Sequence, residues 1–124
     1  LDAGRAVVMF PEGYLRRTDE KPLRRFGQGA AQMLAARPHV PVVCCWIEGA
    51  WGSYTSFKGG PPTKNKTIDC RRPIRIGVSA PELVPADVLA DQIGTRVFLM
   101  NRVLAARAHL GLPPLTAEPA ADDE

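Results

Sequence analysis

A short apolar run that ends in a turn constrains the fold of this chain most strongly. Residues 6–9, Ala-Val-Val-Met, are followed directly by Phe-Pro-Glu-Gly at residues 10–13. Because glycine and proline bound the run, we expect a short buried strand over residues 5–10. A strand that ends in proline, a carboxylate and a glycine brings polar groups to the mouth of an α/β sheet, where such sheets bind their ligands.

The pattern beyond this turn alternates helix and strand. We expect helices over residues 29–37 and 85–110, and strands over residues 40–47 and 73–78. Residues 40–47 are apolar on both faces, which is typical of a central parallel strand. The first strand, the first helix and this strand would then form a right-handed βαβ crossover. Residues 48–72, which are polar and rich in glycine, are expected to form a long loop of the kind that is often functional.

The helix expected over residues 85–110 has one apolar face. Its members step by three or four positions and are Leu89, Ile93, Val97, Met100, Leu104 and Ala108. We expect this face to dock on the sheet, with a helix lying on a membrane surface as the alternative. No apolar stretch approaches the roughly 18 residues that span a bilayer.

The positive charge is unevenly distributed. Four of the 13 acidic residues fall in residues 116–124, for which we expect an acidic, disordered tail. The remaining body holds 16 basic and nine acidic residues, a formal charge of +7. Such a body favours an anionic partner: a phosphorylated substrate, an anionic membrane surface or nucleic acid. A well-solvated surface is the alternative.

The three cysteines, Cys44, Cys45 and Cys70, have no spacing typical of a metal site. We therefore expect reduced, buried thiols and no metal. The sequence shows no activation of Cys44, so an inert thiol is favoured over a nucleophile.

The turn at residues 10–13 leads into a basic stretch. Five cationic residues lie within ten positions: Arg16, Arg17, Lys21, Arg24 and Arg25. Arginine offers a planar fork that suits phosphate. Glu12 repels a phosphate, so we expect it to fix a neighbouring arginine or to accept a hydrogen bond from a glycerol hydroxyl. Gly13 can adopt a positive φ and let the backbone approach an anion.

A cluster of aromatic residues with nearby lysines opens the long loop. It comprises Trp46, Trp51, Tyr54 and Phe57, followed by Lys58, Lys64 and Lys66. Such a cluster suits a small core beneath the loop, a membrane interface, or stacking on single-stranded nucleic acid. The sequence leaves these three alternatives open.

The succession of motifs resembles the glycerolipid acyltransferase family, whose members acylate lysophosphatidic acid and other lysophospholipids. The resemblance lies in Phe-Pro-Glu-Gly at residues 10–13, the basic stretch, Phe-Gly-Gln-Gly-Ala at residues 26–30 and Val-Pro-Val-Val at residues 40–43. It covers roughly residues 6–78, and residues 46–54 further resemble a bacterial subgroup. The resemblance implies an α/β fold, a partial parallel or mixed sheet flanked by helices. Residues 1–115 would be the C-terminal part of the acyltransferase domain, with the N-terminal half missing.

The resemblance also implies a function. Members of the family transfer an acyl group from acyl-CoA or acyl carrier protein to the hydroxyl of a lysophospholipid or glycerol phosphate, with no cofactor beyond the acyl donor. A histidine five residues before an aspartate acts as general base on that hydroxyl. Here Cys44 lies five positions after His39, and Pro114 five after His109, so no catalytic residue is expected in this chain.

The chain is therefore expected to supply only the acceptor-phosphate pocket and to be inactive alone. By the resemblance, that pocket would use Glu12, Gly13 and either Arg16 or Arg17. We expect the parent enzyme to sit at the cytoplasmic side of the membrane, peripheral or tethered by its other parts, with no specific nucleic acid as partner. Two alternatives stay open: a non-catalytic lipid-binding module of the same fold, and a basic nucleic-acid-binding domain.

Overall fold

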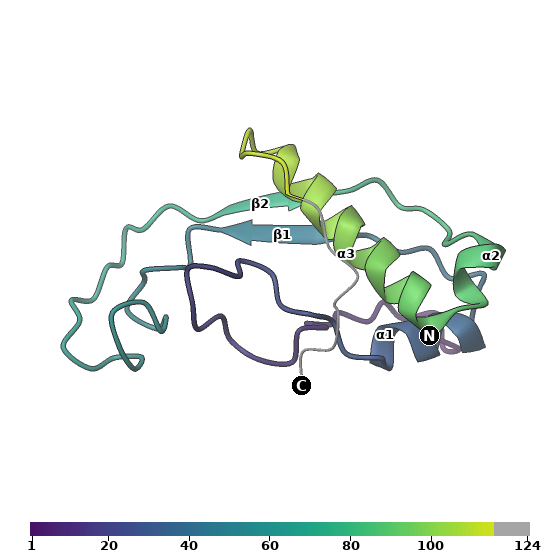
Figure 1. Ribbon diagram of the computed structural model, residues 1–124, viewed down its shortest axis with the longest axis horizontal. Helices are drawn as coiled ribbons and strands as arrows, with labels where there is room; N and C mark the ends of the chain where they lie inside the picture. The colour runs from purple at the N-terminus through teal and green to yellow at the C-terminus, as the bar shows by residue number, and fades with distance from the viewer. Residues whose placement is uncertain (116–124) are drawn as a thin grey trace.

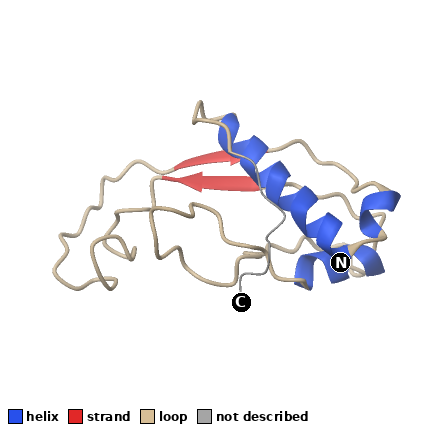
Figure 2. Cartoon of the chain, viewed as in Figure 1, coloured by secondary structure: helices blue, strands red, loops and turns tan. Residues whose placement is uncertain are grey.

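Helices gather at one end of the molecule and long loops extend from the other (Figure 2). The computed structural model describes residues 1–115, so the tail expected over residues 116–124 lies outside the described residues. The regular elements of the described part are α1 (Gly29–Ala36), β1 (Cys45–Glu48), β2 (Arg75–Val78), α2 (Ala86–Leu89) and α3 (Gln92–Ala108). In Figure 1, α3 crosses one face of the β1–β2 ribbon, with α1 and α2 beside its N-terminal end.

The two strands of the described part pair antiparallel. The register brings together Cys45 and Val78, Trp46 and Gly77, Ile47 and Ile76, and Glu48 and Arg75. The parallel crossover predicted over residues 5–47 is absent from the described residues, because residues 5–10 form no strand. Residues 49–74 form the predicted long loop, and they return the chain beside β1 in the opposite direction. The whole α/β fold that the resemblance implies stays a prediction.

The strand predicted over residues 5–10 does not form. These residues have no regular structure, and the side chains of Val8 and Phe10 are 82% and 76% exposed. A strand requires a neighbour to pair its backbone groups. No described strand lies beside this segment, so its apolar run faces solvent instead of a core.

The helix predicted over residues 85–110 is broken at Asp91. Its carboxylate accepts hydrogen bonds from the backbone N–H groups of Ile93 and Gly94, each at 3.1 Å. These are two of the donors that a helix N-terminus leaves without partners, and an aspartate at this position begins a new helix. The helix predicted over residues 29–37 is confirmed to within one residue as α1.

Docking of α3 on the sheet is confirmed, but the predicted apolar face is only partly correct. The buried residues of α3 are Thr95, Leu99, Met100, Leu104 and Ala106. Met100 and Leu104 were expected there, whereas Ile93 is 57% exposed because it lies in the first turn, at the end of the packed face.

Most of the buried residues form two clusters, which follow one another along α3. The first consists of Phe26, Leu34, Cys44, Val84, Leu99 and Met100, and the second of Trp46, Leu104 and Ala106. In the second cluster the absence of a side chain at Gly77 lets α3 approach β2 closely. A Cβ atom at Gly77 would lie 2.1 Å from the carbonyl oxygen of Ala106.

Candidate functional site

The stretch that follows the Phe-Pro-Glu-Gly turn is a closed loop, which we call the basic loop (residues 13–25). Oε2 of Glu12 accepts a hydrogen bond from the backbone N–H of Arg24 at 2.8 Å. Beside it, the N–H of Gly27 donates to the carbonyl of Pro11 at 2.7 Å. Glu12 therefore fixes a neighbouring arginine, as one of the two predicted roles has it, but through the arginine's backbone and not its guanidinium.

Gly13 begins the loop in the left-handed conformation that the sequence predicted. Its φ is +69°, and its N–H donates to the carbonyl of Phe10 at 3.1 Å. No atom outside its sequence neighbours lies within 4 Å of the place where a Cβ would stand. The glycine is thus required by its dihedral angle, since the surrounding space would admit a side chain.

The side chain of Arg16 turns back onto its own loop. Its Nε donates to the carbonyl of Thr18 at 2.8 Å, and its Nη2 to that of Asp19 at 3.2 Å. The guanidinium lies over the ring of Trp51, 4.4 Å from the centroid, and Trp51 Nε1 donates to Asp19 Oδ1 at 2.5 Å. Arg16 thereby joins two loops, and its charge is balanced by the Asp19 carboxylate.

Arg17 has a different environment. It is exposed, and its guanidinium lies over the ring of Phe57 at 4.7 Å from the centroid. Within residues 1–115 the guanidinium makes no hydrogen bond or ion pair. Of the two arginines that the sequence offered, Arg17 is the one whose N–H donors are available to a ligand.

The partner of the basic loop is a second loop, which we call the aromatic loop (residues 49–66). Both loops extend to the same side of the molecule, away from the helices (Figure 1). Arg72 holds the start of the aromatic loop, because its guanidinium donates to the carbonyls of Gly49 and Trp51. The contact between the two loops was not predicted, since the sequence gives no sign of which arginine faces which ring.

The structure separates the aromatic residues that the sequence grouped together. Trp46 is buried on β1 under α3, and its Nε1 donates to Glu48 Oε2 at 2.8 Å. Trp51 and Phe57 are half-buried and carry arginines on their rings. Among the three alternatives for this cluster, the small core beneath the loop describes Trp46 best, and the other two stay predictions.

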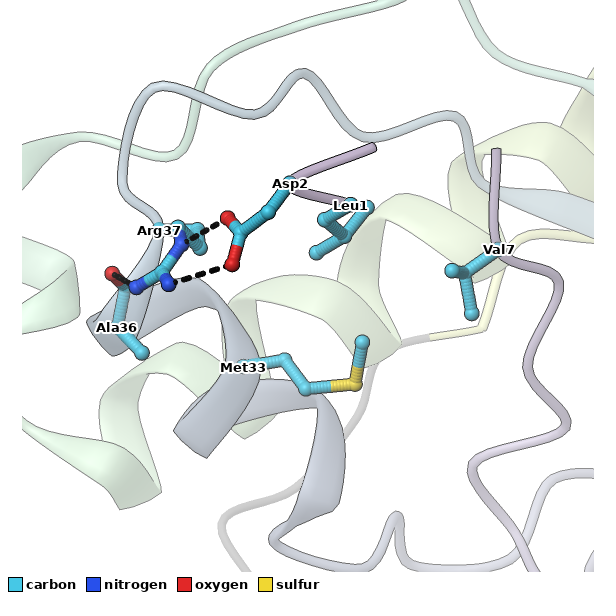
Figure 3. Close-up of a pocket in the computed structure, with 6 residues that line it drawn as sticks. All are labelled: Leu1, Asp2, Val7, Met33, Ala36 and Arg37. Carbon is cyan, nitrogen blue, oxygen red and sulfur yellow. Dashed lines mark hydrogen bonds and ion pairs between the residues drawn. The ribbon is translucent and has the colours of Figure 1, made fainter. Parts of the chain in front are cut away.

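A pocket of about 260 Å³ lies elsewhere, between α1 and the N-terminal residues (Figure 3). It is lined by Leu1, Asp2, Val7, Met33, Ala36 and Arg37. Arg37 Nε and Nη2 donate to the two carboxylate oxygens of Asp2 at 2.5 and 2.8 Å, and these bonds, with the positive charge, lower the pKa of Asp2. None of the lining residues belongs to the basic loop, and the two charged side chains of the pocket, Asp2 and Arg37, are paired with each other.

The cysteines do not form a site in the described part of the chain. Cys44 is 6% exposed, and burial, with a smaller contribution from Glu82, raises the pKa of its thiol to about 11. Cys45 and Cys70 are exposed, so the prediction of buried thiols is correct only for Cys44. Within residues 1–115, no three His, Cys, Asp or Glu side chains are grouped to hold a metal ion.

Comparison with protein-family models, with curated proteins and with solved structures finds no match to this chain. None of the helices in residues 1–115 has the length and apolar character that crossing a membrane requires. The basic loop, with Glu12 at its base and Arg17 exposed on it, is therefore identified from its residues and contacts alone.

Proposed function

We propose that this chain binds the phosphate group of a lysophospholipid or glycerol phosphate as the acceptor pocket of a glycerolipid acyltransferase. The order of its motifs supports this, because Phe-Pro-Glu-Gly and the basic stretch follow one another as in that family. The acyl donor would be acyl-CoA or acyl carrier protein, and the acceptor hydroxyl would attack the thioester carbonyl.

The observation that carries the proposal is the environment of Arg17. Its guanidinium is exposed on a loop that Glu12 closes, and it meets no acceptor within the described residues. A guanidinium binds phosphate through two parallel N–H bonds, and such charge-assisted bonds are about twice as strong as neutral ones. The guanidinium of Arg16 instead donates hydrogen bonds to carbonyl groups of its own loop and stabilises the shape of that loop.

Each proposed residue then has one task. Glu12 closes the basic loop, Gly13 supplies the turn that begins it, and Arg17 binds the phosphate. The chain contains no histidine followed five residues later by an aspartate, so the general base for the acceptor hydroxyl would come from another part of the enzyme. An acceptor held by its phosphate would present its hydroxyl to that base in a fixed orientation.

An NMR titration of the ¹⁵N-labelled chain with glycerol 3-phosphate tests the proposal, with glycerol as the phosphate-free comparison. We expect shifts in the basic loop for glycerol 3-phosphate only. Arg17→Ala should weaken binding about ten- to a hundredfold, since a hydrogen bond to a charged group contributes roughly 1.5–3 kcal/mol. Arg25→Ala removes the same charge from the same loop and should have little effect.

The Arg25→Ala control distinguishes a specific phosphate site from attraction of the ligand by the net charge of the loop. If Arg17→Ala and Arg25→Ala weaken binding equally, the basic loop attracts anions through net charge and the proposed pocket is wrong. A titration with a single-stranded oligonucleotide tests the nucleic-acid alternative, which predicts tighter binding than glycerol 3-phosphate and shifts in the aromatic loop as well.

A further inference from the structure

The arginine proposed to bind phosphate is held by a ring from another loop. Arg17 of the basic loop lies over Phe57 of the aromatic loop, forty positions further along the chain. We infer that Phe57 is a positioning residue, which holds the Arg17 guanidinium in the orientation that receives the acceptor phosphate. The inference rests on the proposed function and adds to it a residue that the sequence motifs do not include.

The contact restricts Arg17 without using its donors. The attraction between a guanidinium and a ring face acts on the charge through the π system. Within residues 1–115 the N–H groups of the Arg17 guanidinium meet no hydrogen-bond acceptor. An exposed arginine otherwise samples many rotamers, and it loses this freedom when it binds a ligand. Holding the side chain beforehand lowers that cost and strengthens binding.

Phe57 itself lies on a braced turn. Its carbonyl accepts a hydrogen bond from the N–H of Gly60 at 3.2 Å. The ammonium of Lys66 donates to the carbonyls of Ser56 and Gly60, on either side of this turn. Lys66, one of the lysines that follow the aromatic cluster in the sequence, is thus used inside the loop. A ring on a braced turn can hold an arginine in one place.

The second contact between the loops has a different character. Arg16 lies over Trp51 in the same manner, but the Asp19 carboxylate bonds to the indole and lies 3.9 Å from the guanidinium. That contact joins the loops, and the negative charge of Asp19 balances the positive charge of Arg16. Of these two contacts, only that of Arg17 with Phe57 presents a cation that no carboxylate within residues 1–115 neutralises.

The test substitutes the ring and measures glycerol 3-phosphate binding by the full chain. Phe57→Leu keeps an apolar side chain but removes the π face, and we expect it to weaken binding about two- to fivefold. Phe57→Tyr keeps the ring and should restore wild-type affinity. In an Arg17→Ala background, Phe57→Leu should have no further effect, as a double-mutant cycle requires of a residue that acts through Arg17.

A matched control and a direct probe accompany these variants. Phe98→Leu removes the comparable contact of Arg102 with a ring on α3, and it should leave the affinity unchanged. The side-chain NMR signals of Arg17 should be shifted by the ring current of Phe57, and Phe57→Leu should abolish that shift.

The outcomes separate the two proposals. If Arg17→Ala weakens binding while Phe57→Leu does not, the phosphate site stands and the positioning role of Phe57 is wrong. If Arg17→Ala itself leaves the affinity unchanged, the proposed function fails and the positioning role fails with it. Weakened binding by Phe57→Leu in the Arg17→Ala background would also contradict the inference, because the ring would then act independently of that arginine.

Discussion

The carboxylate of Glu12 and the backbone N–H of Arg24 lie 2.8 Å apart, although the two residues are twelve positions apart in the sequence. This bond fastens the end of the basic loop to its beginning, directly after the turn. The loop therefore has a fixed base, and Arg17 is presented from it at a defined place. In the proposed phosphate site, Glu12 would contribute through this geometry, since its own charge would repel the ligand.

Glu12→Ala should open the basic loop. A hydrogen bond to a charged group contributes roughly 1.5–3 kcal/mol, so the open population should rise about ten- to a hundredfold. Trypsin should then cut after the arginines of residues 16–25 correspondingly faster, because proteolysis follows the open population when the loop opens and closes rapidly. Limited digestion with mass spectrometry measures the rates.

Glu12→Gln is the matched control for this experiment. Its amide carbonyl can accept the same N–H but carries no charge, so the cutting rate should fall between wild type and Glu12→Ala. Equal cutting rates in all three proteins would contradict the closing role of Glu12.

Gly77→Ala should destabilise the fold through the contact between β2 and α3. The added methyl group would meet the carbonyl oxygen of Ala106 at 2.1 Å, so strand and helix must separate. Overpacking of this kind costs about 1–3 kcal/mol. Urea denaturation followed by circular dichroism measures the change in the free energy of unfolding.

Gly29→Ala makes the same chemical change at the first residue of α1. There a Cβ atom would meet only the end of the Met9 side chain, at 3.7 Å, which is ordinary contact. Because alanine also favours helix, this variant should be neutral or more stable by up to about 1 kcal/mol. Equal stability of the two variants would show that α3 and β2 are not in close contact.

Cys44 should resist alkylation in the native chain. A thiol with a pKa of about 11 is ionised in only about one molecule in a thousand at pH 8, and the side chain is buried as well. Iodoacetamide at pH 8 should therefore add two groups, at Cys45 and Cys70, and a third only in denaturant. Three adducts formed at equal rates without denaturant would show that the site is accessible.

The raised pKa of Cys44 also predicts how the free energy of unfolding changes at alkaline pH. Its pKa is raised from 9.0 in the unfolded chain to about 11 in the folded one, so the folded state holds the proton more tightly. The folded state is thus favoured below pH 9, and this advantage is lost as pH rises from 9 to 11. Cys44→Ala should show a smaller fall in the free energy of unfolding over that range than wild type does.

The exposed apolar run at the N-terminal end should bind a hydrophobic dye. Val8 and Phe10 face solvent, and so do Ile47, Ile76 and Val78 on the face of the ribbon opposite α3. Exposed apolar side chains in such numbers favour dye binding and aggregation. Phe10→Ser should reduce the dye fluorescence without lowering stability, because that side chain packs little. A soluble monomer that melts sharply and binds no dye would contradict this prediction.

The chain alone should release no thiol from acyl-CoA when lysophosphatidic acid is supplied. It lacks a histidine with an aspartate five residues later, and therefore lacks the proposed general base with its partner. A thioester-release assay measures this, with heat-denatured chain as the blank. Turnover well above the blank would mean that the catalytic groups lie elsewhere in this sequence.

Local signals in the sequence determined the elements whose causes lie within a few residues. The alanine-rich stretch before Pro38 predicted α1, and the apolar alternation at residues 74–78 predicted β2. Gly13, which as a glycine can adopt a positive φ, has a φ of +69°. These features depend on backbone preferences and short-range hydrogen bonds, which neighbouring residues set.

Tertiary structure decided what depends on a distant partner. An apolar run becomes a strand only where another strand pairs with it. Residues 5–10 have no such partner among the described residues and are irregular, whereas β1 pairs with β2 in an antiparallel ribbon. From the sequence alone, Arg16 and Arg17 were equally good candidates for the phosphate-binding residue. In the folded chain they differ. Arg16 lies over Trp51, whose indole N–H donates to the Asp19 carboxylate, whereas Arg17 lies over Phe57 and has no carboxylate of residues 1–115 beside it. Such pairings follow from how two loops meet, which neither loop specifies by itself.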